Sequence, residues 1–67
     1  MSVAKVIEIS AQSPDSFEAA VKEGLNRAGK TVDNIQSAWV KEMKADVKDG
    51  KISGYRVDMK VTFILSD

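Results

Sequence analysis

The sequence predicts an α+β protein of the β-α-β-β type, with a three-stranded antiparallel sheet in the order 1-3-2 packed on one helix. Apolar residues stand at every second position from Tyr55 to Leu65, which is the period of a half-buried strand. Between Phe17 and Ala28 they recur at intervals of three and four, the period of a helix with one buried stripe. Asp49 and Gly50 favour a tight two-residue turn between two strands. At 67 residues the chain is expected to form a single domain, residues 1–67.

Ser2 to Ser10 is predicted as the first strand because its residues are largely β-branched or aliphatic. Residues 11–13 are predicted to be a short connection. The pair Ser13-Pro14 is predicted to begin the helix, since serine can accept free amide hydrogen bonds of the first turn and proline suits the first helical position.

The helix is expected to present one apolar stripe to the sheet and to end near Gly29 and Lys30, after about 16 residues. Gly24 lies inside this stripe, where glycine costs about 1 kcal/mol of helix propensity relative to alanine. We expect a close approach of helix and sheet at Gly24. The stripe consists of Phe17, Ala20, Val21, Leu25 and Ala28.

The second and third strands are predicted to form a long hairpin from Gln36 to Lys48 and from Lys51 to Asp67. With a two-residue turn, Lys48 pairs with Lys51 and the register of every other pair follows. The third strand can then lie between the first two and run antiparallel to both, while the helix makes the right-handed crossover between them. The expected pairs are Val40 with Met59, Ala38 with Val61, Trp39 with Lys60, Ser37 with Thr62 and Met43 with Arg56.

The hairpin is expected to project beyond the helix. A helix of about 16 residues spans roughly 24 Å, whereas a strand of about 13 residues spans roughly 43 Å. Trp39, Met43 and Ile64 are placed on the face opposite the helix, where one subunit has nothing to cover them. Since the chain has no cysteine to form a disulfide, we expect self-association to complete the fold.

Composition excludes several functional classes. Ten basic and ten acidic residues cancel without segregating, which argues against a nucleic-acid or anionic-membrane surface. No apolar run has the length of a membrane span and no signal peptide is recognisable, so a cytoplasmic protein is expected. Without histidine or cysteine the usual zinc site is excluded, no metal ligands are assigned, and no nucleophile and base pair is present. We therefore expect no enzymatic activity.

Trp39 is the most informative single residue, because it is the only tryptophan and is expected outside the core. An indole beside cationic and hydrogen-bonding neighbours can stack on a planar ligand. It can equally pack between subunits, since aromatic residues are enriched at interfaces.

The chain resembles the dodecins over nearly its whole length. The resemblance rests on the order and spacing of four segments: residues 5–9 (Lys-Val-Ile-Glu-Ile), Ser13-Pro14, residues 31–35 (Thr-Val-Asp-Asn-Ile), and the closing strand from Tyr55 to Leu65. It implies a β-α-β-β fold, assembly as a hollow homododecamer, and storage of flavin (FMN, FAD or riboflavin) in pockets between subunits.

Two positions depart from the pattern of the flavin-binding members that the chain resembles. Those members carry a tryptophan early in the second strand that sandwiches the flavin ring, and a glutamine in the last strand that hydrogen-bonds it. The corresponding residues here are Ser37 and Arg56. Trp39 is two residues further along the strand, so it is expected on the same face, displaced by roughly 6 to 7 Å.

Two hypotheses follow. In the first, the chain is a non-enzymatic flavoprotein that sequesters flavin or a related ligand in inter-subunit pockets, with Trp39, Arg56 and Ser37 as candidate binding residues. In the second, the dodecin-like assembly does not bind flavin: Trp39 and Met43 pack between subunits, and carboxylates such as Asp46 or Asp58 pair with bases or collect a cation.

Overall fold

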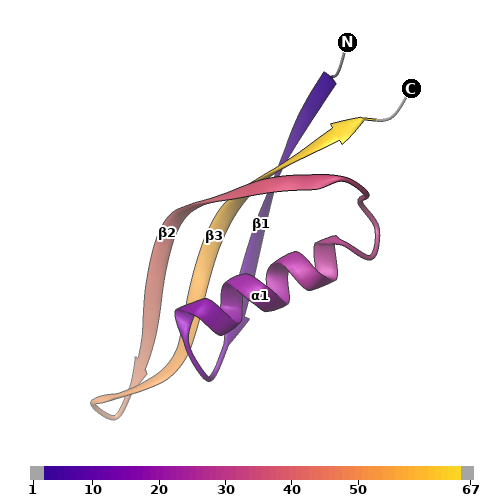
Figure 1. The fold of residues 1–67 in the computed structure, drawn as a ribbon. Helices are drawn as coiled ribbons and strands as arrows, with labels where there is room; N and C mark the ends of the chain where they lie inside the picture. The colour runs from indigo at the N-terminus through magenta and orange to yellow at the C-terminus, as the bar shows by residue number, and fades with distance from the viewer. Residues whose placement is uncertain (1–2, 66–67) are drawn as a thin grey trace.

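The chain folds into a curved three-stranded antiparallel sheet with one helix against it, in the order β1-β3-β2 (Figure 1). The computed structural model describes residues 3–65. Its elements are β1 (Val3–Ser13), α1 (Phe17–Ala28), β2 (Ile35–Lys48) and β3 (Lys51–Leu65). The predicted fold class, element order and strand order are confirmed.

β3 is the central strand and carries the core. Val57, Met59 and Val61 are completely buried, as the alternation predicted, and Ala20 of α1 is buried against them. Tyr55 extends this face, with its ring edge-on to the ring of Phe17 and the centroids 4.9 Å apart. The apolar face of one strand and the stripe of one helix therefore account for the core.

β1 is longer than predicted. Ala11, Gln12 and Ser13 pair with Val57, Arg56 and Tyr55, so the expected connection is the last part of the strand. The prediction was wrong because alanine, glutamine and serine have little preference for strands, whereas pairing with β3 and packing against α1 decide their conformation. Ser2, the predicted first residue, lies outside the described residues.

The helix begins later than predicted. Ser16, not Ser13, is its N-cap: the Ser16 hydroxyl accepts a hydrogen bond of 2.9 Å from the amide of Ala19. The buried Ser13 side chain instead accepts from the amide of Asp15 at 3.1 Å, so Pro14 lies in a turn. The helix end at Gly29 is confirmed.

Gly24 allows α1 to lie close to the sheet. A Cβ atom at this position would lie 2.8 Å from Met59 Cε and 2.9 Å from Ala11 Cβ. Such distances are below van der Waals contact, so the predicted close approach at Gly24 is confirmed.

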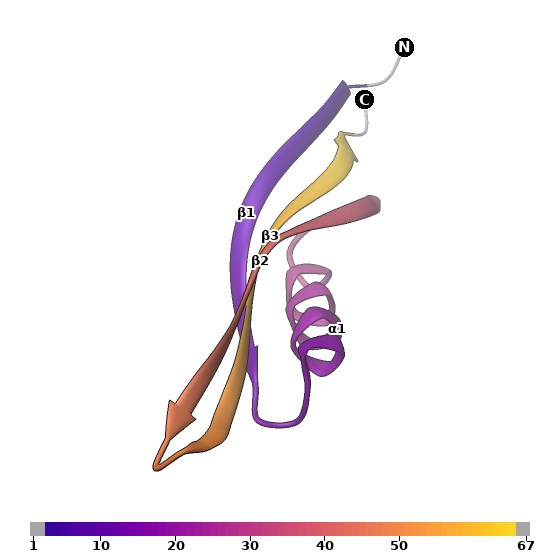
Figure 2. The same ribbon diagram turned by 90° about the vertical axis from the view of Figure 1, so that its left-hand side faces the viewer.

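The hairpin turn has the predicted form. Asp49 and Gly50 have φ values of 53° and 77°, and Lys48 pairs with Lys51. α1 has 12 residues and β3 has 15, so the turn end of the hairpin continues beyond the helix in a molecule 52 Å long (Figure 2). We call the tip of the hairpin, residues 47–52, the arm; it lies beyond Tyr55, the residue that pairs with the end of β1.

The register within the hairpin shifts at three places, one beside Gln36 and two at the β-bulges of Lys41 and Ser53. Ser53 on β3 and Lys41 on β2 have no partner, so residues 42–46 pair one position away from the predicted register. Outside this segment, the predicted pairs of Val40, Ala38, Trp39 and Ser37 are confirmed. Within it, the predicted pair of Met43 with Arg56 is wrong.

The shift also changes the face on which Met43 lies. Met43 pairs with the buried Val57, and directly opposed residues of a sheet share a face. Met43 is therefore on the helix side of the sheet, although it remains exposed because α1 packs against β1 and β3.

Candidate functional site: the open face of the sheet

The face of the sheet opposite α1, which we call the open face, carries Trp39. Trp39 is 65% exposed, and the cross-strand residue Lys60 places its ammonium nitrogen 5.9 Å from the ring centroid. A cation over an aromatic ring at an exposed site stabilises the pair by about 0.5–1 kcal/mol. Ser37 lies two residues before Trp39 on the same strand and face, opposite Thr62. One region of the open face thus presents an aromatic surface, a cation and two hydroxyls.

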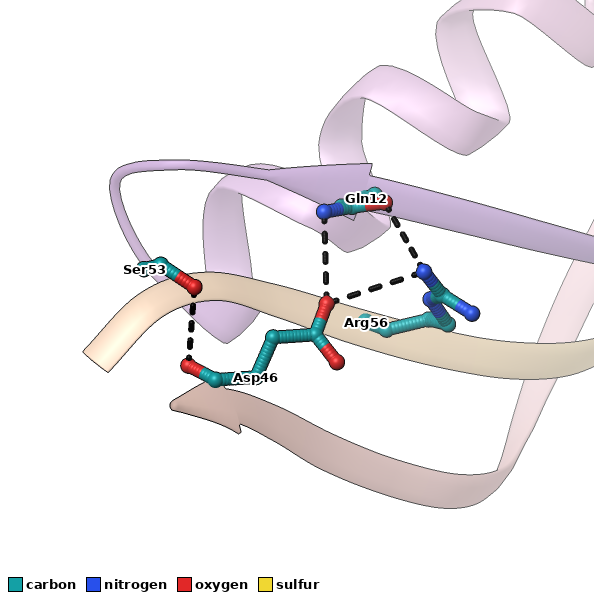
Figure 3. Close-up of polar contacts among 4 residues, drawn as sticks. All are labelled: Gln12, Asp46, Ser53 and Arg56. Carbon is teal, nitrogen blue, oxygen red and sulfur yellow. Dashed lines mark hydrogen bonds and ion pairs between the residues drawn. The ribbon is translucent and has the colours of Figure 1, made fainter. Parts of the chain in front are cut away.

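Arg56 lies further toward the arm, within a polar cluster that links all three strands (Figure 3). Its Nη2 donates to Gln12 Oε1 at 3.2 Å and lies 3.6 Å from Asp46 Oδ2. The Gln12 Nε2 in turn donates to the same Asp46 oxygen at 3.3 Å. Gln12, Asp46 and Arg56, which we call the polar cluster, come from β1, β2 and β3.

Gly54 and the bulge at Ser53 make room for this cluster. A Cβ atom on Gly54 would lie 2.8 Å from Gln12 Nε2 and 3.6 Å from Asp46 Oδ2, so the absence of a side chain lets Gln12 cross to Asp46. The Ser53 hydroxyl donates to the Asp46 backbone carbonyl at 3.3 Å. The bulge therefore also anchors the strand from which the Asp46 carboxylate extends.

Charged side chains of the open face are arranged in rows across β2 and β3. Lys44 pairs with Arg56, and Glu42 pairs with Asp58, so a pair of cations is followed by a pair of carboxylates. Glu42 and Asp58 line a shallow cavity of about 380 Å³ together with Glu8, Ile9, Ser10 and Lys41. Lys41 Nζ lies 3.9 Å from Glu8 Oε2.

The candidate residues do not form one compact site. Trp39 and Ser37 are neighbours on the open face, but Arg56 is four residues along β3 from Lys60, the partner of Trp39. At about 3.4 Å per residue, that separation is roughly 14 Å. The structure therefore has an aromatic region around Trp39 and a cationic region around Arg56, with the Glu42 and Asp58 pair between them.

Sequence reasoning missed Gln12 and Lys44. The second hypothesis paired Asp46 with a basic residue without naming it, and the ion pair with Arg56 confirms that pairing. Gln12 was predicted to lie in a connection, and the two bulges, which the sequence does not mark, place Lys44 opposite Arg56. The alternation along β3 was the available signal. If β1 were expected to pair with β3 over the whole alternating segment, it would have been predicted to extend to the residue opposite Tyr55, which is Ser13.

Metal ligation and membrane insertion both bear on the class of site. In the part of the chain that the structure describes, no three acidic, histidine or cysteine side chains are grouped so that they could hold a metal ion. None of the helical residues described is part of a segment both long and apolar enough to cross a membrane.

Comparison with known proteins identifies the family. The model of the dodecin family matches residues 3–66. The chain is 45% identical over 64 residues to the calcium dodecin of Mycobacterium tuberculosis, covering 94% of this chain and 89% of that protein. The chain belongs to the dodecin family, as its resemblance predicted.

Solved structures agree with this assignment. A dodecin from Streptomyces davaonensis superimposes with a TM-score of 0.94 at 33% identity, covering 98% of this chain and 97% of that one. The crystal structure of the M. tuberculosis calcium dodecin, described as calcium chelating with a novel calcium-binding site, gives a TM-score of 0.83 at 38% identity. That match covers 96% of this chain and 91% of the calcium dodecin.

Proposed function

We propose that the chain is a non-enzymatic binding and storage protein that holds a planar small molecule, with flavin as the ligand, against Trp39 on the open face. The observation that carries this proposal is the exposed Trp39 on β2, with a cation over its ring. A largely exposed tryptophan offers a large apolar surface that a planar ligand would remove from water. Membership of the dodecin family supports the choice of flavin as the ligand to test.

Titration with riboflavin or FMN, followed by quenching of flavin fluorescence, tests this proposal. We expect quenching at micromolar protein and its loss in Trp39→Ala. Met43→Ala is a matched control, because Met43 is also an exposed apolar residue of β2 but lies on the helix side. No quenching by the unmodified protein, or equal quenching by the Trp39→Ala variant, would refute flavin stacking on Trp39.

Self-association is the second part of the proposal. The arm and its base expose Met43, Val47 and Ile52 at 58%, 65% and 55%. Val47 pairs with Ile52, and alternation along β2 puts Met43 on the same face. Two large exposed apolar side chains on the arm, with a third beside them on the same face of the sheet, are typical of a surface covered by another copy of the chain.

A second expected contact surface lies along the free edge of β1. The free edge of β1 and α1 border a hollow of about 540 Å³, lined by residues that include Ile7, Ile9 and Thr31. Unpaired strand edges are readily covered by a second chain. We therefore expect a homo-oligomer, a dodecamer if the chain assembles as its resemblance to the dodecins implies, and native mass spectrometry measures the number of subunits.

Introducing a charge on the arm tests whether the arm is a contact between subunits. Val47→Lys should shift the native mass toward smaller species, because it puts a cation at the centre of the apolar surface of the arm. Lys22→Gln, a charge change on an exposed helix residue, should leave the mass unchanged. An unchanged mass in Val47→Lys would show that the arm is not a subunit contact.

Cation binding is a second candidate function, favoured by the Glu42 and Asp58 pair. Like charges directly opposed across two strands are destabilising, and a divalent cation between them would remove the repulsion. A relative with 45% identity is a calcium dodecin. Because calcium takes six to eight oxygen ligands, two carboxylates would need water or a second copy of the chain to complete the site.

Calcium titration separates this candidate from flavin storage. Calcium binding by calorimetry, abolished in Asp58→Asn and retained in Trp39→Ala, would support the cation site. Asp46 is the less suitable ligand, because Arg56 and Gln12 already contact its carboxylate. Equal calcium binding by Asp58→Asn would exclude the Glu42 and Asp58 pair.

A further inference from the structure

The turn at the end of the arm is the dipeptide Asp49-Gly50, and no other aspartate or asparagine of the chain precedes a glycine. Both residues are exposed, and a Cβ atom on Gly50 would meet nothing within 4 Å. Among residues 3–65 the Gly50 amide makes no backbone hydrogen bond, since a two-residue turn pairs only the residues that flank it. The Gly50 nitrogen is therefore accessible to an electrophile that lies beside it.

The Asp49 side chain supplies that electrophile. Its carboxyl carbon can close a five-membered ring with the nitrogen of the next residue, and glycine has no side chain to block the approach. In the part of the chain that the structure describes, no ion pair holds the Asp49 carboxylate away from this nitrogen. Asp46 is the opposite case, because Gln12 and Arg56 contact its carboxylate and the β-branched Val47 follows it.

Ring closure requires the backbone of Asp49 to rotate, and the arm allows this rotation. β1 ends opposite Tyr55, and the turn lies beyond the helix (Figure 2). A hairpin of two strands alone is marginally stable in water, so the arm opens locally more often than the three-stranded sheet. Asp49 has a φ of 53°, a left-handed conformation that is less favourable for aspartate than for glycine, so little opposes its rotation.

We propose that Asp49 is a modification site at which the chain converts itself to isoaspartate without an enzyme. The Gly50 nitrogen forms a bond to the carboxyl carbon of Asp49, and the N–H proton leaves with the hydroxyl of the protonated carboxyl as water. Water then opens the cyclic imide. Opening at the side-chain carbonyl restores aspartate, whereas opening at the main-chain carbonyl leaves the chain running through the side chain and the former main-chain carbonyl as a carboxylate.

Isoaspartate lengthens the main chain of the turn by a methylene group. The turn pairs Lys48 with Lys51 directly, so this pair and the next one, Val47 with Ile52, lose their register. The bulge at Ser53 separates both pairs from the three-stranded sheet, which keeps its core. The effect on assembly rests on the proposed function, in which the arm is a contact between subunits: an isomerised chain loses that contact and remains folded.

Incubation of the assembled protein at neutral pH and physiological temperature tests this inference. An endoprotease that cleaves before aspartate but not before isoaspartate measures the conversion at each position. We expect isoaspartate to accumulate several-fold faster at Asp49 than at Asp46, and the native mass to shift toward smaller species as it accumulates.

Two variants that keep the turn provide matched comparisons. Asp49→Gly forms the same type of turn but has no side chain to close the ring, so its native mass should stay constant during incubation. Asp49→Asn also suits this turn and should react several-fold faster than the unmodified protein, because ammonia leaves more readily than water in the ring closure. Its conversion of an amide into an acid is visible in the intact mass.

The chemical and the assembly measurements separate two steps. Isoaspartate at Asp49 no more abundant than at Asp46 would overturn the inference. A constant native mass despite isoaspartate, in a protein that Val47→Lys does dissociate, would overturn the loss of register. If neither isoaspartate nor Val47→Lys changes the mass, the arm contact of the proposed function is refuted, and the modification itself is supported by the protease measurement.

Discussion

Replacing Gly24 by alanine tests how closely α1 and the sheet are packed. The new methyl group would lie 2.8 Å from Met59 Cε and 2.9 Å from Ala11 Cβ. The Met59 methyl group ends a flexible side chain and can move. The Ala11 Cβ is attached directly to the backbone of β1, so the helix and the strand must separate.

Two opposing effects determine how much Gly24→Ala changes the free energy of unfolding. Overpacking of a core costs about 1–3 kcal/mol, whereas alanine in place of glycine inside a helix contributes about 1 kcal/mol of propensity. Because the contact with Ala11 cannot be relieved by a side-chain rotation, we expect a net loss of about 1 kcal/mol in the free energy of unfolding. Urea unfolding at one fixed protein concentration measures it, since the stability of an oligomer depends on concentration.

Gly29→Ala is the matched control. Gly29 has a helical φ of −64°, so alanine fits its backbone, and the change should be neutral or stabilising by up to about 1 kcal/mol. Its Cβ would lie 3.3 Å from the Leu25 carbonyl oxygen, a smaller conflict than either contact at Gly24. If Gly24→Ala were as stable as the unmodified protein, close packing at Ala11 could not be the reason for glycine.

Two more substitutions test local elements. Ser16→Ala should lower the free energy of unfolding by about 1 kcal/mol, because the amide of Ala19 loses its capping acceptor. An unchanged urea midpoint would show that Ser16 is not the effective cap. Gly50→Ala should cost about 1–2 kcal/mol, since φ at this turn residue is +77° and nothing lies within 4 Å to explain any loss by a clash. Urea unfolding measures this loss as well, and a neutral result would contradict a strained turn.

The core and the topology could be predicted because each depends on a pattern that repeats. The alternation along β3 identifies Val57, Met59 and Val61, and a single turn at Asp49 and Gly50 determines that β2 and β3 pair and the register at both ends of residues 42–46. Consistent local signals of this kind specify a fold even where individual preferences are weak.

Two predictions were wrong, the end of β1 and the start of α1. Both depended on single local interactions. Ser13 and Ser16 both accept an amide hydrogen bond, but only the bond at Ser16 caps the helix. Which serine takes that role depends on how far β1 continues, and pairing with β3 decides this rather than the sequence around Pro14.

The bulges at Lys41 and Ser53 decide which residues of β2 lie on the open face and which lie on the helix side. Without them, alternation from Trp39 would place Met43 and Val47 on the open face. The unpaired residues Lys41 and Ser53 move residues 42–46 by one position, which transfers Met43 and Val47 to the helix side. The same shift turns Glu42, Lys44 and Asp46 toward the open face.

Two residues without partners thus separate an apolar contact surface from a charged binding surface on a single strand. A continuous hairpin would have mixed the two, since exposed apolar residues would then lie beside Arg56. On the proposed function, this separation lets copies of the chain cover the arm while the open face remains available to a ligand. Gln12 lies across from Arg56 only because β1 continues to Ser13. The charged surface therefore depends on the length of β1 as well as on the two bulges.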